Sequence, residues 1–539
     1  MPVLQSLIDP GSARFVQQRE QMLALIDAFR GLEDRVRETS NGMATKFRAR
    51  RQLLPRERVA RLLDRGSPWL ELSTLAGYRM HDDDGDRNVL GGGLLTGIGI
   101  VSGLRCMVFA SDSAIKGGTI APMGLKKSLR AEAIALENRL PVVRLVESGG
   151  ANLMHVGEVF IEGGRGFANQ ARLSAAGIPQ VTVMHGHSTA GGAYLPGMSD
   201  YVVMVRGRAK AFLAGPPLLK AATGEIATDE ELGGAEMHTH VSGVAEYLAE
   251  DDVDGIRIAR DVLAKLPRND GQPAVPARDW KPPRYPADDI AGLVPPDYRQ
   301  PYDVRELLAR LIDDSDFLDF KPDYGAATVC GHGAIDGQRC GFIGNNGPID
   351  PQGANKATQF IQLCHQSGTP LVFLQNTTGF MVGKDVEQAG MIKHGSKMIQ
   401  AVANCTVPRI TLMIGASFGA GNYGMCGRAY DPQFVFAWPN ARVAVMGGEQ
   451  AAMVMRIVTE DKLARAGKTA DPAALDAMRA EIVQRFDLES QALYATARLW
   501  DDGLIDPRDS RQVLASALAV CREGRARTLR PSSFGVARM

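Results

Sequence analysis

Two stretches of the sequence repeat one pattern, MHGHSTAGGAY at residues 184–194 and MIGASFGAGNYG at residues 413–424. Each begins as an apolar, strand-like run, passes through a glycine-rich turn and continues as a helix-like segment. The separation in sequence between Ser188 and Ser417 equals that between Gly192 and Gly421. This constant separation, the repeat offset, indicates an internal duplication.

The repeat offset extends outward from the two turns. The run PVVRLV begins at Pro141, and its counterpart PLVFLQ begins one repeat offset later, at Pro370. Nearer the N-terminus, Cys106 and Cys340 have a slightly larger separation, which a five-residue difference in loop length explains. A period this long predicts two copies of one α/β domain and not a solenoid.

Length and composition describe an ordinary globular chain. Its 539 residues predict two to four domains at about 100–200 residues each. The 61 Lys and Arg balance the 61 Asp and Glu, which argues against a nucleic-acid binder. The 59 glycines are about 11% of the chain against a usual ~7%, and ordered turns explain part of that surplus without disorder.

The ends and the cysteines predict a cytoplasmic protein. The N-terminus MPVLQSLIDP has no basic region followed by an apolar one, so we expect no secretory signal. No run approaches the ~18 apolar residues of a membrane span, so we expect no membrane association. The seven cysteines are scattered without a CxxC pair, which favours reduced thiols and no structural zinc site.

The remaining patterns suggest how the chain is divided. Residues 12–65 have helical spacing, and residues 46–65 are basic, as a solvated helix face or a phosphate-binding surface would be. Nine of the 29 prolines lie between Pro267 and Pro301, which predicts a linker. We expect a helical segment over 1–75, a first copy of the domain over 76–285 and a second copy over 286–539.

Three chemistries compete for the repeated turn. GAGNYG at 419–424 matches the dinucleotide motif GxGxxG, but the first copy lacks the third glycine and no suitable acidic residue follows. GASFG at 415–419 matches the nucleophile elbow GxSxG, but no histidine follows His394; Ser188 with His238 or His240 stays possible. The third is an oxyanion hole made of backbone N–H groups, which alone explains why the turn occurs twice.

Other motifs are absent or weak. His185 and His187, like His238 and His240, could share one side of a strand, but no third ligand follows at metal-site spacing, so we expect no metal. The triplet GKT at 467–469 ends like a P-loop, but Lys462 stands where the first glycine belongs. The Met-Lys pair of a biotin-attachment site does not occur. We therefore expect neither an ATP site nor attached biotin on this chain.

Several motifs together resemble the β (carboxyltransferase) subunits of biotin-dependent acyl-CoA carboxylases, in the 3-methylcrotonyl-CoA and geranyl-CoA branch. The resemblance covers about residues 45–535, and its motifs are KGGT at 116–119, ESGGANL at 147–153, TAGGAY at 189–194, GAGNYGMCGRAY at 419–430, WPNAR at 438–442 and MGGEQAA at 446–452. It implies tandem crotonase-like (ClpP/crotonase) β-β-α superhelix domains. It also implies dimers that complete each active site within a β6 core, and an α-subunit partner that supplies biotin carboxylase and carries the biotin.

The resemblance also implies roles for individual residues. Gly191 and Gly192 would hold the acyl-CoA thioester oxygen as it becomes an enolate, and Ala420 and Gly421 would hold the ureido oxygen of biotin. Phe380 and Gly419 would complete the biotin side. The CoA substrate would contact Lys116, Gly117, Gly118, Gly150, Ala151 and Ala190.

The implied reaction moves CO2 from carboxybiotin to the γ-carbon of a β-methyl, α,β-unsaturated acyl-CoA, with biotin itself as the base. The segment from Glu158 to Ala168 is shorter, richer in glycine and less aromatic than is typical of methylcrotonyl enzymes. This departure favours geranyl-CoA over 3-methylcrotonyl-CoA. The alternatives are a carboxylase for another acyl-CoA, propionyl-like or longer, and a stand-alone crotonase-type hydratase or thioesterase.

Overall fold

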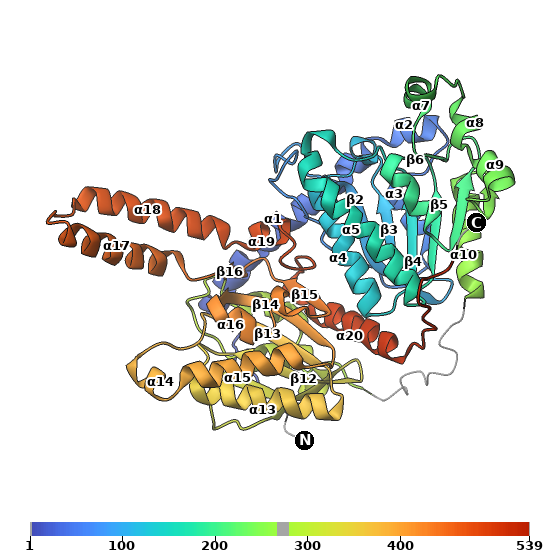
Figure 1. The fold of residues 1–539 in the computed structure, drawn as a ribbon. Helices are drawn as coiled ribbons and strands as arrows, with labels where there is room; N and C mark the ends of the chain where they lie inside the picture. Colours follow the sequence, from blue (N-terminus) through green and yellow to red (C-terminus); the bar gives the residue numbers. More distant parts are fainter. Residues whose placement is uncertain (1–2, 267–279, 538–539) are drawn as a thin grey trace. The chain divides into compact units, whose positions relative to one another are not determined.

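The apolar runs that the sequence repeats form parallel strands at the centre of two separate sheets (Figure 1). The computed structural model describes residues 3–266 and 280–537. β4 (Val142–Val146) pairs with β5 (Gln180–Met184) in parallel, and β13 (Leu371–Thr377) pairs with β14 (Arg409–Phe418) in the same way. All five residues of β4 and of β5 are buried, as in parallel strands covered on both faces.

The strand registers confirm the duplication. Val142 lies opposite Gln180, and Leu371 lies opposite Arg409, which are the same two positions moved by the repeat offset. The preceding hairpins pair Leu94 with Ser111 and Thr328 with Asn345, again equivalent positions at the slightly larger separation of Cys106 and Cys340. The two copies therefore share their hydrogen-bonding pattern as well as their sequence motifs.

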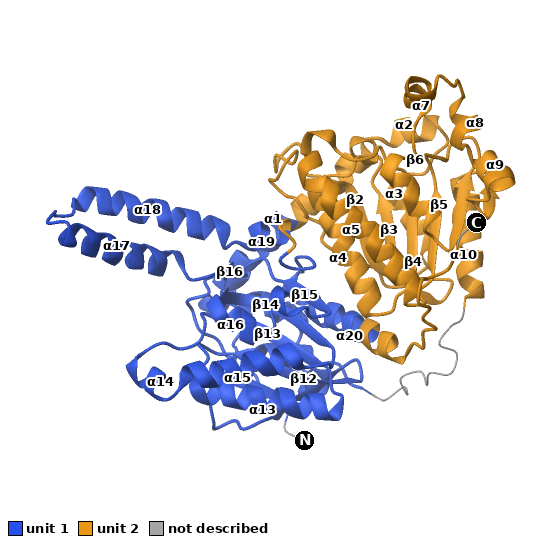
Figure 2. Cartoon of the chain, in the orientation of Figure 1, with its two compact units in different colours: residues 1–29, 274–496, 500–519 blue, residues 30–273, 497–499, 520–539 orange. Residues whose placement is uncertain are grey.

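The chain divides into two compact units, which Figure 2 colours separately. Unit 1 holds residues 1–29, 274–496 and 500–519, and unit 2 holds residues 30–273, 497–499 and 520–539. Each unit therefore takes its main body from one half of the chain and a terminal segment from the other. Because the units are discontinuous in sequence, they divide the chain differently from the expected bounds 1–75, 76–285 and 286–539, which stay a prediction.

Unit 2 contains the first sheet and its helices. In spatial order the strands are β1 (Leu70–Glu71), β2 (Leu94–Val101), β3 (Leu104–Ser111), β4, β5, β7 (Tyr201–Val205) and β9 (Tyr247–Ala249), with β6 (His187–Thr189) and β8 (Lys210–Phe212) as a separate pair. The helices are α2 (Ala44–Ala49), α3 (Pro55–Leu62), α4 (Pro122–Glu137), α5 (Val156–Ala175), α6 (Tyr194–Gly197), α7 (Pro216–Thr223), α8 (Asp229–Gly233), α9 (Ala235–Met237) and α10 (Asp252–Lys265).

The core of unit 2 lies between one sheet face and two helices. Val59 of α3 and Ile256 of α10 pack in one buried cluster with alternate residues of β3, β4, β5 and β7. α4 and α5 contact each other and carry the buried polar residues Glu132 and Gln170. The helices predicted over 12–65 are confirmed as α1 (Ala13–Asn41), α2 and α3.

Unit 1 contains the second sheet. Its strands are β10 (Leu318–Asp319), β11 (Thr328–Ile335), β12 (Gln338–Asn345), β13, β14 and β15 (Phe434–Ala437), with β16 (Arg442–Ala444) paired to the end of β14. Its helices are α11 (Ile290–Leu293), α12 (Val304–Leu311), α13 (Pro351–Ser367), α14 (Lys384–Gln388), α15 (Met391–Asn404), α16 (Gly419–Gly424), α17 (Gly448–Arg465) and α18 (Pro472–Glu489). α1, α19 (Ala492–Ala497) and α20 (Ser510–Ala526) contribute residues to both units.

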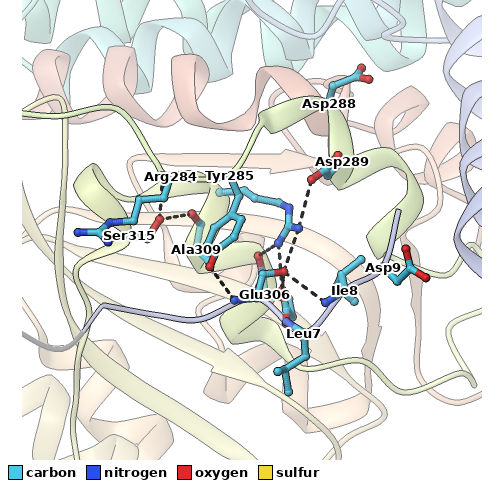
Figure 3. Close-up of polar contacts among 12 residues, drawn as sticks. Leu7, Ile8, Asp9, Arg284, Tyr285, Asp288, Asp289, Glu306, Ala309 and Ser315 are labelled. Carbon is cyan, nitrogen blue, oxygen red and sulfur yellow. Dashed lines mark hydrogen bonds and ion pairs between the residues drawn. The ribbon is translucent and has the colours of Figure 1, made fainter. Parts of the chain in front are cut away.

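The proline-rich segment corrects one prediction. Residues 267–279 lie outside the described residues, but residues 280–301 are part of unit 1 and not a linker. All four residues of α11 are buried, and the Tyr285 hydroxyl accepts the backbone N–H of Ser6 at 2.9 Å. Glu306 accepts the N–H of Leu7 at 2.6 Å, so the N-terminal segment is fixed against this region (Figure 3). The high density of prolines correctly argued against a long regular helix in this segment. It could not distinguish a linker from irregular backbone that packs into a domain.

Two further observations concern the cysteines and the helices. All seven cysteines are buried, and none of them forms a disulfide bond. Among the described residues, no helix has both the length and the apolar character that a membrane crossing requires.

Candidate active site

The first glycine turn follows β6 and is a 3-10 turn, Ala190–Ala193, that leads into α6. Ala190 has φ +54°, a left-handed conformation that is strained for a residue with a Cβ atom. The Ser188 hydroxyl donates to the Gly192 carbonyl at 2.8 Å. A Cβ atom at Gly192 would lie 2.9 Å from that hydroxyl, so the position requires glycine. The first N–H groups of such a turn have no partner inside it and can face a ligand oxygen.

The second glycine turn shares one unusual backbone angle with the first, although it is an α-helical turn and not a 3-10 turn. β14 continues directly into α16, and Gly419 has φ +54°, the value of Ala190 at the equivalent position. A Cβ atom at Gly421 would lie 2.8 Å from the Gly379 Cα atom. A side chain at this position would therefore force two loops of unit 1 apart. Phe380 lies beside the turn, since a Cβ atom at Gly424 would lie 2.9 Å from its ring.

Several residues predicted to contact CoA lie close to Gly150, whose equivalent in the second copy is Gly379. Gly150 has φ +85° and its equivalent Gly379 has φ +126°. The Ile120 N–H donates to the Gly150 carbonyl at 2.8 Å, and Ile120 forms a bridge with Ala151. The Ser148 hydroxyl donates to the Gly118 carbonyl at 3.2 Å. The turns at 116–118 and 148–151 are therefore adjacent.

A backbone hydrogen bond connects these turns to the first glycine turn. The Ser148 N–H donates to the His187 carbonyl at 2.7 Å, and His187 begins the strand that ends just before Ala190. Unit 2 thus brings together Lys116, Gly117, Gly118, Gly150, Ala151 and Ala190. Unit 1 brings together Phe380, Gly419, Ala420 and Gly421.

Lys116 is the exposed cation of this group. Its ammonium lies 2.7 Å from Asp82 and lowers the pKa of that carboxyl, and its side chain is 45% exposed. The basic segment 46–65 divides into two sets. Arg56 pairs with Glu71 at 2.9 Å and Arg58 is 1% exposed, so neither is free for a phosphate. The exposed members are Lys46, Arg48, Arg50, Arg51, Arg61 and Arg65.

The match to known proteins covers almost the whole chain. The family model described as "Carboxyl transferase domain" matches residues 46–536. A probable biotin-dependent acyl-coenzyme A carboxylase beta2 subunit of Mycobacterium tuberculosis is 49% identical over 539 residues, all of both chains. The mitochondrial methylcrotonoyl-CoA carboxylase beta chain of Dictyostelium discoideum is 45% identical over 100% of this chain and 91% of its own. The crystal structure of the P. aeruginosa geranyl-CoA carboxylase beta subunit matches with TM-score 0.94 and 59% identity over 100% of both chains.

The chain belongs to the carboxyl transferase family, among the β subunits of biotin-dependent acyl-CoA carboxylases. The tandem crotonase-like fold expected from the sequence is confirmed.

In this carboxyltransferase a buried network of charges lies beneath the first glycine turn. Arg58 pairs with Glu147 at 2.7 Å and with Asp252 at 3.2 Å. His185 Nδ1 lies 3.0 Å from Asp252. Burial alone would raise the pKa of Asp252, but His185 and Arg58 lower it to about 2. Burial, followed by the Arg58 charge, lowers the pKa of His185.

This network holds the turn at 148–151 in place. Glu147 directly precedes Ser148 and Gly149, and it also accepts the Ser113 hydroxyl at 2.9 Å. A Cβ atom at Gly186 would lie 2.6 Å from the Glu147 side chain, so the carboxylate packs against the backbone that leads into the turn. The roles of Arg58 and Asp252 were not predicted from the sequence, because their partners are distant in the chain. For Glu147 the ESGG motif gave the only signal.

The nucleophile-elbow hypothesis fails in this carboxyltransferase. Both ring nitrogens of His238 are occupied, Nδ1 by Ser242 at 2.7 Å and Nε2 by the Ala211 carbonyl at 2.6 Å. Ser188 is buried and donates to Gly192, and Ser417 donates to Gln375 at 2.6 Å. Both hydroxyls therefore donate hydrogen bonds that stabilise the two turns, and neither is activated as a nucleophile.

One face of α5 is open next to the first turn. A Cβ atom at Gly191 would lie 3.7 Å from the Phe167 ring, which also contacts the Tyr194 ring. Gly163 and Gly164 precede Phe167 by four and three residues, so they lie on the same helix face. A Cβ atom at either glycine would meet nothing within 4 Å. Neither the packing nor the backbone of this unit requires these glycines, although each costs a helix about 1 kcal/mol relative to alanine.

Proposed function

We propose that this β subunit transfers CO2 from biotin, carried by a partner α subunit, to the γ-carbon of a β-methyl, α,β-unsaturated acyl-CoA, with geranyl-CoA preferred over 3-methylcrotonyl-CoA. The repeated turn carries the proposal, because it supplies one set of backbone donors for each of two carbonyl-type oxygens. The N–H groups of Gly191 and Gly192 hold the thioester oxygen while negative charge develops on it. Those of Ala420 and Gly421 hold the ureido oxygen of biotin.

The residues present fit these two groups. A Cβ atom at Gly192 would displace the Ser188 hydroxyl and one at Gly421 would meet Gly379, so a side chain at either position would shift the backbone N–H groups that we assign to these oxygens. Phe380 is only partly buried beside Gly424 and gives an apolar surface for a bicyclic ring system. Biotin, when carboxylated, supplies the CO2. The work of this chain is to position the acceptor and to stabilise its enolate.

The open face of α5 supports the preference for a longer acyl group. Gly163 and Gly164 leave space beside the first turn that the unit itself does not fill. A geranyl chain needs such space, whereas the shorter methylcrotonyl group does not. The 59% identity to the geranyl-CoA carboxylase β subunit points the same way, but the methylcrotonoyl-CoA carboxylase relatives at 45% identity keep the smaller substrate in consideration.

The CoA phosphates are assigned to Lys116 and to the exposed arginines of segment 46–65. An α subunit with biotin carboxylase activity completes the enzyme, since no P-loop and no Met-Lys pair occur in this sequence. α5 and α17 carry exposed apolar side chains, including Phe160, Ile161 and Met453. These exposed side chains support a homo-oligomer of the β6 type. The seven reduced thiols support a cytoplasmic location.

The test is fixation of labelled bicarbonate by the complex of this chain with its biotin-carrying subunit and ATP. We expect incorporation into geranyl-CoA with a higher kcat/KM than into 3-methylcrotonyl-CoA. Omission of ATP or of the biotinylated subunit should abolish it. Turnover of an enoyl-CoA or a thioester by the chain alone would instead support a hydratase or thioesterase, and labelling of propionyl-CoA alone would reject the branched-acyl assignment.

A further inference from the structure

Three metal-ligating side chains meet on the surface of unit 2, away from both glycine turns in sequence. His81 lies in the segment before β2, His155 ends the 3-10 turn Leu153–His155, and Glu158 lies in the first turn of α5. His81 Nε2 is 3.2 Å from each carboxylate oxygen of Glu158. One ligand atom from each of the three residues lies within 4.8 Å of the other two.

The distances suit a tetrahedral metal ion. Zinc binds imidazole nitrogen and carboxylate oxygen at about 2.0–2.2 Å, which places two such ligands about 3.3–3.5 Å apart. The 3.2 Å between His81 and Glu158 is already close to that separation. The rings of His81 and His155 meet edge to face with centroids 4.9 Å apart, so the second imidazole lies next to the first.

The backbone around the cluster is held in place by other contacts. His81 has φ +54°, a left-handed conformation that turns the chain sharply at this residue. Asn152 accepts the Met154 N–H at 3.1 Å and donates to Asp82 at 2.9 Å, which joins the two segments that carry the histidines. Asp82 also lies 3.4 Å from His155 Nε2. The two halves of the cluster are therefore connected without an ion and do not need to be assembled by one.

The ligand set selects the kind of ion. Two imidazoles with one carboxylate suit zinc, cobalt, nickel or copper, whereas magnesium and calcium prefer oxygen ligands. Asp82 lies beside the cluster, but its carboxylate is already paired with the Lys116 ammonium at 2.7 Å, so Glu158 is the carboxylate that would compensate the ion. The side chains of His81 and His155 are 16% and 22% exposed, and that of Glu158 is 54% exposed, so the site is shielded on one side and open on the other.

We propose that His81, His155 and Glu158 bind a divalent transition-metal ion of the zinc type, which ties the segment before β2 to the start of α5. α5 carries Gly163 and Gly164, and Asp82 holds Lys116, so the ion would fix elements on both sides of the acyl-CoA site. The expectation of no metal rested on the two His-x-His pairs, which lack a third ligand at metal-site spacing, and on the absence of a CxxC pair. Here His81 comes from a segment far in sequence from the other two ligands, so no local spacing can reveal the complete set.

The experiment uses the full chain after removal of metal with a chelator. We expect one equivalent of Zn2+ to raise the midpoint of thermal unfolding, because an ion that binds only the folded state stabilises it. Co2+ should give visible d–d absorption that Zn2+ displaces, and Mg2+ should do neither. Carboxylation is not the readout, so failure of the proposed function would leave this result unaffected.

Variants identify the site. His81→Ala and His155→Ala should each weaken Zn2+ binding by more than the about 10–100-fold that loss of an outer-shell partner costs. Glu158→Gln keeps the size of the side chain and should lose affinity without a change in the metal-free unfolding midpoint, which controls for misfolding. His240→Ala removes an exposed histidine outside the cluster and should bind Zn2+ like the wild type. The proposal is overturned if the wild type binds no Zn2+ at micromolar concentration, or if the His81→Ala/His155→Ala double variant binds it unchanged.

Discussion

The two glycine turns have the same φ at the equivalent positions Ala190 and Gly419, but the side chains that support them differ in charge. In the first copy Gly186 packs on the carboxylate of Glu147, and in the second its equivalent Gly415 packs on the amide of Asn376, where a Cβ atom would lie 2.3 Å from Oδ1. The carboxylate needs Arg58 at 2.7 Å to compensate its charge. The Asn376 amide oxygen accepts the Ala416 N–H at 3.2 Å and needs no ion. Ion pairs therefore support the first glycine turn in unit 2, and neutral hydrogen bonds support the second glycine turn in unit 1.

The difference matches the chemistry assigned to each turn. The Glu147 network lies next to the turns that we assign to an anionic CoA substrate, and Lys116 and the exposed arginines add positive charge on that side. The turn assigned to biotin faces a neutral ureido group, and its supports Gln375, Ser417 and Asn422 are neutral as well. The two copies thus share their glycine positions, whereas the side chains beneath the turns are charged in unit 2 and neutral in unit 1.

The largest expected effect comes from breaking the ionic support. Arg58→Met leaves the buried Asp252 and the largely shielded Glu147 without their cation, and we expect the free energy of unfolding to fall by about 3–5 kcal/mol. Asn376→Ala removes the neutral equivalent and should cost about 1–3 kcal/mol. Urea unfolding of the two variants measures the contrast. Equal losses would show that the charge of the network contributes nothing beyond a neutral contact.

The next largest effect is the loss of kcat when a side chain is added at either glycine turn. Gly192→Val should lower kcat by about 10²–10³-fold, because the side chain meets Ser188 and displaces an enolate-binding N–H. The matched Gly421→Val variant should lose as much through the biotin side. A Cβ atom at Gly197 meets nothing within 4 Å, so Gly197→Ala is the control and should keep normal turnover. If Gly192→Val keeps its activity in a folded complex, the oxyanion-hole assignment is wrong.

Some of these supports could be predicted from the sequence and others could not. The repeat offset predicted two copies of one domain, and the registers of β4 with β5 and of β13 with β14 agree with that duplication. It also located both glycine turns. It could not reveal that Arg58 reaches Glu147 and Asp252, since those contacts depend on how α3 and α10 pack on the sheet. Nor could proline density distinguish a linker from the packed segment 280–301.

Acidic pH should weaken the ionic network around Asp252 but not the neutral hydrogen bonds around Asn376. The pKa of Asp252 is about 2 in the folded protein, below its unfolded value of about 3.9, so its stabilising effect is present above about pH 4. It is lost as the pH falls from about 4 towards 2, when the folded carboxylate is protonated. The stability difference between wild type and Asp252→Asn, about 2–3 kcal/mol at pH 7, should therefore shrink over this window in urea titrations. A difference that stays constant from neutral pH down to about pH 2 would contradict the ionic support.

Substrate size should depend on the open face of α5. Gly163→Phe fills the space beside Phe167, and we expect kcat/KM for geranyl-CoA to fall about 10–200-fold relative to 3-methylcrotonyl-CoA. Gly157→Phe is the control, because Gly157 is also open but lies almost three helical turns before Phe167. Equal selectivity in the two variants would remove α5 from the acyl site.

The smallest effect tests whether the two turns are equivalent in strain. Ala190 and Gly419 have the same φ of +54°, but only Ala190 bears the penalty of a Cβ atom in the left-handed region, about 1–2 kcal/mol. Ala190→Gly removes this strain and adds flexibility to the unfolded chain at about 0.5–1 kcal/mol, so we expect a net gain of about 0.5–1 kcal/mol. Gly419→Ala should have the opposite sign and a larger size, because its Cβ atom would also lie 3.1 Å from the Val445 carbonyl.

Thermal unfolding of both variants gives the signs of these two changes. The steady-state kinetics of Ala190→Gly then show whether unit 2 keeps the strain because the N–H groups of the turn must be held rigidly. A gain in stability with a lower kcat supports that reason, since a looser turn would place its donors less well on the developing enolate. A gain with unchanged kcat means that the alanine is tolerated and serves no purpose in the reaction.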